Sequence, residues 1–184
     1  MPRVPAITRR EDLPPEHQPR FDAIAQSRGG RIAGPFKVLL NSPEVAARAA
    51  HLGAYLRFES SLRPDLRELA ILNAARENDC QYEFTAHVPL ARQQGVREEA
   101  ITAIAERRAP EGLTPEEAII TRYAQEIVRQ RRVSEETFQA ALAHLGTRGV
   151  TELTALLGYY TMLAFALNAF QVELEPGAAP LMPE

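Results

Sequence analysis

The chain has 184 residues, one cysteine and a formal net charge of −3 at pH 7. This length fits a single domain with one core, and a lone cysteine excludes both an internal disulfide and a four-cysteine zinc site. The weak charge and the lack of a long basic stretch argue against a nucleic-acid surface, while an unpaired thiol is typical of a reducing compartment, so we expect a cytoplasmic protein that binds no nucleic acid.

The first 15 residues contain four prolines and are predicted to form an extended N-terminal arm, 1–15. They lack the apolar stretch that a secretory signal requires. A short helix is expected over about 16–27, after which the pairs Gly29-Gly30 and Gly34-Pro35 interrupt the chain.

Proline and capping residues mark the starts of the later helices. Ser42 as N-cap and Pro43 in the first turn predict a helix to about Glu59. Further helices are expected over about 64–78, over the segment directly after it to about Gly95, and over about 97–107, 114–131 and 134–144. A last helix should begin at 147 or 149 and end at about 171. No strand pattern is evident, so the sequence predicts an all-α, single-domain helical bundle over 16–175, followed by a tail, 176–184.

One segment, Leu153 to Val172, carries no formal charge and is nominally long enough to cross a bilayer. It contains several polar residues, among them Tyr160 and Asn168, and no lysine or arginine cluster flanks it. We therefore predict a helix of the core or of a subunit interface, and no membrane partner.

Glu68 is conspicuous in the helix expected over 64–78. That helix is apolar on almost every side, so it is predicted to lie deep in the fold. The angular neighbours of Glu68 are Ile71, Leu72 and Ala75, so its carboxylate projects from an apolar arc and needs a partner or a shifted pKa.

A thiol, a carboxylate and an imidazole follow at Cys80, Glu83 and His87, at spacings that one helix would bring within about 60° of one another. By itself such a set arises by chance: Cys80 would be a small buried residue, Glu83 and His87 an ordinary i,i+4 pair, and Glu68 the partner of an arginine. Glu68 on the preceding helix favours a site for acid–base chemistry. Cys80 and His87 are two turns apart, which is long for ligands of one ion, so no metal or other cofactor is predicted.

The stretches Glu68-Leu69-Ala70-Ile71-Leu72 and Cys80-Gln81-Tyr82-Glu83-Phe84-Thr85-Ala86-His87-Val88 resemble the carboxymuconolactone decarboxylase and alkylhydroperoxidase D-like family. Gly34-Pro35-Phe36, Leu39 to Glu44 and the helix from Gly158 to Asn168 extend the similarity to about residues 30–175. The resemblance implies a homo-oligomer, a trimer or a trimer-based hexamer, with its site near a subunit boundary.

The family divides at this motif. In its peroxidase branch a cysteine four residues before the histidine reacts with peroxide, and a cysteine three residues earlier resolves it as a disulfide. Here Glu83 stands at the reactive position, so a disulfide cycle is unavailable to Cys80. Glutamate before histidine, as in Glu83 and His87, is similar to the decarboxylase branch.

The sequence therefore predicts a decarboxylase-like lyase acting on a small lactone or carbonyl acid. Glu83 and His87 would be the proton-transfer pair, Glu68 would tune His87, and an arginine would bind the substrate carboxylate. The candidate arginines, between which the sequence does not choose, are Arg57, Arg63, Arg67, Arg76 and Arg92. Two alternatives stay open: a one-cysteine thiol-dependent hydroperoxidase acting through Cys80, and a non-catalytic oligomer that binds a small apolar ligand.

Overall fold

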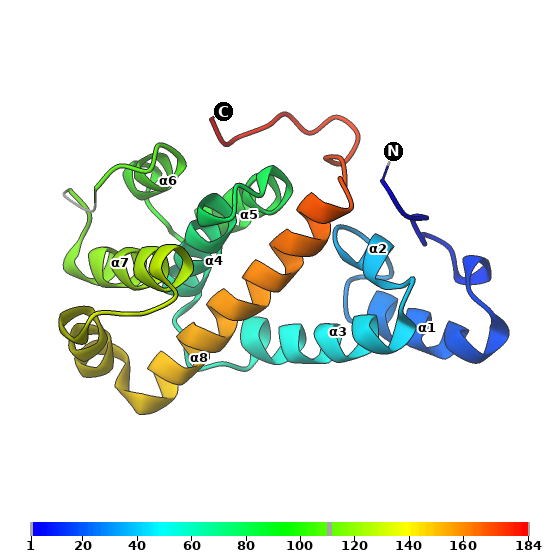
Figure 1. Ribbon diagram of the computed structural model, residues 1–184, viewed down its shortest axis with the longest axis horizontal. Coiled ribbons are helices and arrows are strands. Elements are labelled where there is room, and N and C mark those ends of the chain that lie inside the picture. Colours follow the sequence, from blue (N-terminus) through cyan, green and yellow to red (C-terminus); the bar gives the residue numbers. More distant parts are fainter. Residues whose placement is uncertain (1, 110–111, 184) are drawn as a thin grey trace.

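The computed structural model describes residues 2–109 and 112–183. In these two ranges all regular secondary structure is helical and no strand is present, which confirms the all-α prediction (Figure 1). Its helices are α1 (Gln18–Gln26), α2 (Phe36–Leu39), α3 (Pro43–Phe58), α4 (Pro64–Glu77), α5 (Gln81–Gln93), α6 (Glu98–Ala105), α7 (Pro115–Gln130) and α8 (Glu135–Ala169). The short α2 lies where the sequence indicated only a chain break.

The helices start where local chemistry indicated. Pro43, Pro64 and Pro115 each occupy the first helical position of their helix, where a missing N–H costs nothing. The break expected near Gly146 is present inside α8, because Gly146 has φ 69° and ψ 174° and separates two helical stretches. These boundaries follow from sequence-local preferences, which is why they could be predicted.

Helix α4 is the centre of the bundle. It packs against α5, α6, α7 and α8, so that other helices surround it (Figure 1). Four consecutive residues, Leu69, Ala70, Ile71 and Leu72, are at most 1% exposed. A helix that is apolar all round has to be covered on all sides, and this is the environment that the sequence predicted for it.

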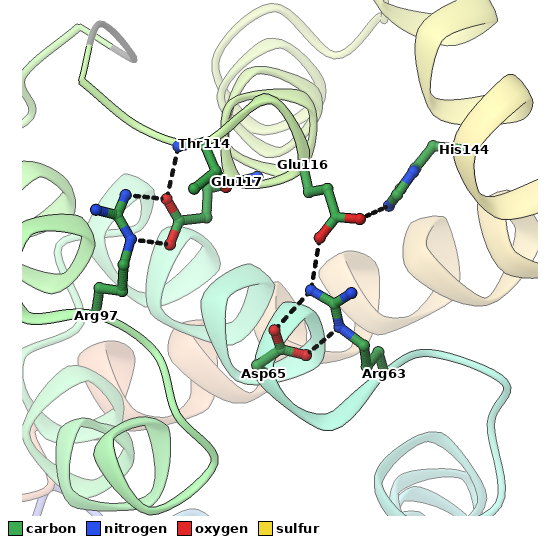
Figure 2. A network of polar contacts seen from close by, with 7 residues as sticks. All are labelled: Arg63, Asp65, Arg97, Thr114, Glu116, Glu117 and His144. Atoms are coloured by element: carbon green, nitrogen blue, oxygen red, sulfur yellow. Dashed lines mark hydrogen bonds and ion pairs between the residues drawn. The ribbon is translucent and has the colours of Figure 1, made fainter.

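A polar network joins the start of α4 to the start of α7 and to α8 (Figure 2). Arg63 donates hydrogen bonds to Asp65 and to Glu116, and Oε1 of Glu116 lies 3.5 Å from Nε2 of His144. Beside it, Glu117 accepts a 2.8 Å hydrogen bond from the backbone N–H of Thr114 and pairs with Arg97. These contacts fix the start of α7 against α4 and α8.

Helix α8 is the element that matched a membrane span by length and composition, and it is the one helix of this kind in the described residues. In the fold it packs against α4, α7 and α3, and 56% of its most apolar window is buried. Met162 and Phe165 of α8 and Leu52 and Phe58 of α3 remain exposed. Self-assembly through such surfaces stays a prediction.

Both ends of the described chain pack onto the bundle. Ile7 in the expected extended arm is buried, and its N–H donates to the carbonyl of Lys37. In the expected tail, Met182 is buried and the N–H of Leu181 donates to Thr85 on α5. These contacts could not be predicted, because single apolar residues in proline-rich segments form no periodic pattern.

Glu152 on α8 ties the end of α3 to the bundle. Its carboxylate accepts hydrogen bonds from the hydroxyl of Tyr55, the hydroxyl and N–H of Ser61, and Arg148. Although burial opposes it, these donors together lower the pKa of Glu152 to about 2. The folded protein therefore binds this proton more weakly than the unfolded chain does.

Glu152 is expected to stabilise the fold above its ordinary pKa of 4.5, and this contribution is lost as the pH falls from 4.5 toward 2. Glu152→Gln should lower the free energy of unfolding at pH 7 by about 2 kcal/mol, because its buried donors lose a charged acceptor. The difference from wild type should shrink in acid. Urea unfolding at several pH values measures it, with exposed Glu59→Gln as the control; a difference independent of pH would contradict this role.

Candidate active site

The site forms where α4 packs against α5. Glu68 on α4 and His87 on α5 are 19 residues apart, and Oε2 of Glu68 lies 2.8 Å from Nδ1 of His87. Glu68 is 3% exposed and His87 is 6% exposed. This hydrogen bond between the Glu68 carboxyl group and Nδ1 holds the imidazole in one orientation.

Glu83 completes a line of three titratable groups. It lies one helical turn before His87 on α5, and its Oε2 is 3.4 Å from Nε2 of His87. His87 is thus placed between two carboxyl groups, each facing a different ring nitrogen. The predicted convergence of Glu68, Glu83 and His87 is present in the geometry.

The pKa of Glu83 is raised above its ordinary value, and burial is the main cause. Interactions with His87, Arg57 and Arg28 act in the opposite direction, while Glu68 raises the pKa further. Burial prevails because the charged form of a carboxyl group loses its hydration there. Glu83 therefore keeps its proton to higher pH than an exposed glutamate and can act as a proton donor.

Glu83 and His87 border a cavity of about 670 Å³. Glu83 and His87 form one part of its wall, and Phe36, Tyr82 and Leu163 supply apolar surface. The volume suits a small organic molecule, and a mostly apolar wall with a few polar groups is typical of a ligand site. Acid–base groups and space for a substrate thus occur together.

Two tyrosines of α8, Tyr159 and Tyr160, also line the cavity, and the sequence did not indicate their role. The Tyr160 ring meets the His87 ring edge to face, with centroids 5.2 Å apart. Burial raises the pKa of Tyr160 well above its ordinary value, so its hydroxyl stays protonated and can donate a hydrogen bond. Two adjacent tyrosines in a segment without formal charge were the available signal.

Cys80 does not share the helical face of the other site residues, which corrects the expected arrangement. Asp79 has φ 48° after the end of α4, and Cys80 precedes α5 with φ −95° and ψ 87°. Its thiol is fully buried against Ala164 and Leu167 and is not part of the cavity wall. Burial is the main reason why the pKa of Cys80 rises to about 12.

The structure distinguishes among the candidate arginines, because only Arg57 of the five lines the cavity. Arg63 is held by Asp65 and Glu116 (Figure 2), Arg76 by Asp79, and Arg92 by Glu98. Arg67 lies outside the cavity wall. A further arginine, Arg28, lines the cavity, and the sequence does not indicate this position.

Comparison with protein families gives a match to the carboxymuconolactone decarboxylase family over residues 43–126. This segment runs from α3 into α7 and contains Glu68, Glu83 and His87. A search of curated proteins finds no significant match.

Solved structures share the fold at low sequence identity. A Silicibacter sp. TM1040 peroxidase-related protein has a TM-score of 0.73 at 17% identity, covering 96% of this chain and 95% of that one. The debrominase Bmp8 has a TM-score of 0.72 at 16% identity, with 92% of each chain covered. An Agrobacterium tumefaciens protein, proposed to be an AhpD antioxidant defence protein, has a TM-score of 0.69 at 18% identity, covering 78% of this chain and 99% of that one.

Proposed function

We propose that the chain, which matches the carboxymuconolactone decarboxylase family over residues 43–126, is a decarboxylase-like lyase acting on a small lactone or carbonyl acid. The observation that carries this proposal is the buried line of Glu68, His87 and Glu83 at a cavity of about 670 Å³. Two carboxyl groups on opposite nitrogens of one imidazole are suited to holding and moving a proton.

The proposed reaction needs no redox step. As the bond to the carboxylate breaks and carbon dioxide leaves, its electron pair moves into the neighbouring carbonyl and generates an enolate. His87, held by Glu68 through Nδ1, stabilises the developing negative charge at oxygen. Glu83, kept protonated by burial, gives its proton to the carbon that lost carbon dioxide.

The thiol of Cys80 is expected to take no part in this reaction. Cys80 is fully buried and its pKa is raised to about 12, so little thiolate forms at neutral pH. A thiol reagent should label the denatured chain quickly and the native protein slowly, and Cys80→Ser should keep its decarboxylase activity. Mass spectrometry of the labelled protein measures this. Fast native labelling, with sulfenic acid formed in hydroperoxide, would support a one-cysteine peroxidase instead.

A further inference from the structure

We infer that Arg57 and Arg28 together form an anion subsite in the cavity, and that the ligand it takes is a carboxylic acid bound as its carboxylate. The inference deepens the proposed function, because it rests on the cavity being the active site. It assigns a role to two residues from different parts of the chain, the end of α3 and the segment after α1.

Arg57 is a cation without a protein counter-charge among the described residues. It lines the cavity, no carboxylate of those residues is within ion-pair distance of it, and its Nε is buried without a hydrogen-bond partner. The guanidinium carbon lies 5.1 Å from the centre of the Phe58 ring, which supplies no negative formal charge. A buried donor left unpaired is costly, so a ligand that accepts from it gains the corresponding free energy.

Arg28 is fixed in place by neutral groups. Its guanidinium carbon lies 3.8 Å from the centre of the Phe36 ring, and the side chain lines the same cavity as the hydroxyl-bearing Tyr159, whose pKa it lowers against the effect of burial. In the part of the chain that the structure describes, no acidic side chain pairs with it. Stacking orients the guanidinium while leaving its charge uncompensated, as a preorganised anion site requires.

Other carboxylates near the cavity already have partners. Glu175 pairs with Lys37 and accepts from Tyr82, and Glu83 faces His87. The electrostatic influence of Arg57 and Arg28 nevertheless reaches Glu83 and opposes its burial. An anionic ligand on the two arginines would therefore lie close to the proton-transfer pair.

Guanidinium groups favour carboxylates because two parallel N–H groups match two oxygens. The remaining wall, with Phe36, Tyr160 and Leu163, suits an apolar carbon skeleton next to that anionic end. A neutral hydroperoxide would leave both cations unpaired. The geometry thus favours an organic acid over an uncharged substrate.

Calorimetric titration with malonate, and with malonamide as its uncharged counterpart, tests the subsite. Wild type is expected to bind malonate and not malonamide at concentrations up to about 10 mM. Arg57→Gln and Arg28→Gln should each weaken malonate binding about tenfold or more, and Arg57→Lys should keep part of the affinity because the charge remains. The matched control is Arg48→Gln, also on α3, which removes an exposed arginine paired with Glu44 and should leave binding unchanged.

Circular dichroism melting checks that each variant is folded. The subsite is overturned if wild type does not bind malonate, if malonamide binds equally well, or if the Arg57 and Arg28 variants bind as wild type does. Titration requires no turnover, so it separates the two proposals. Malonate binding that depends on the arginines in a protein without decarboxylase activity would leave the subsite intact and refute the proposed function.

Discussion

His87→Ala is expected to reduce decarboxylation of a 4-carboxymuconolactone-type acid by at least about 10³-fold, which is within the range for loss of a general acid–base group. The imidazole is the shared partner of Glu68 and Glu83, so its removal also leaves two buried carboxyl groups facing each other. Release of carbon dioxide, followed at saturating substrate, measures the effect. Most of the loss should fall on kcat, because His87 acts on charge that develops in the transition state.

The matched control for this change is His51→Ala, which removes an exposed histidine on α3 and should leave turnover unchanged. Circular dichroism melting of both variants separates loss of chemistry from loss of fold. If His87→Ala turns over as wild type does, the proton-transfer mechanism is wrong. If neither wild type nor variant shows turnover while apolar ligands bind, the non-catalytic alternative is supported.

Glu83→Gln is expected to lower kcat about 10²-fold and to remove a limb of the pH profile. Burial raises the pKa of Glu83, and the proposed mechanism needs its proton. Wild-type kcat should therefore fall as the pH rises through that raised pKa. The amide of the glutamine variant does not titrate, so its remaining kcat should not show this fall. Measurement of kcat against pH for both proteins tests this.

The effect of Glu83 on stability should change with pH in the opposite direction to that of Glu152, because its pKa is raised on folding and that of Glu152 is lowered. A carboxyl group whose pKa is raised on folding contributes stability below its ordinary value of 4.5, and loses it as the pH rises toward the folded pKa. Glu83→Gln should therefore gain stability relative to wild type as the pH rises. Exposed Glu59→Gln serves as the control, and a relative loss over that range would contradict a protonated Glu83.

Much of the fold could be predicted because its signals are local. Pro43, Pro64 and Pro115 fixed three helix starts, and Gly146 fixed the break in α8. The placement of Glu68 was also predictable, since a carboxylate within an apolar arc of a central helix has to find a polar partner. Its partner is His87, on the next helix.

The remaining features depend on contacts between distant segments or on single backbone angles. Helical spacing places Cys80 on the face of Glu83 and His87, but the helix begins one residue later, at Gln81. The positive φ of Asp79 gives the chain before α5 a direction that helical spacing does not predict. Arg28 and Tyr159 lie near opposite ends of the sequence, and no periodicity connects them. The helical face of Glu83 and His87 was predictable, whereas the opposite wall of the cavity was not.

The residues that line the cavity come both from the segment that matches the family and from its flanks. Glu68, Glu83 and His87 belong to the segment that matches the family, whereas Arg28 and Tyr160 lie outside it. Exchange of the flanking segments would therefore alter which molecules fit while leaving the proton-handling groups on α4 and α5 in place. In a chimaera that keeps residues 43–126 and takes its flanks from another relative, substrate preference should follow the flanks.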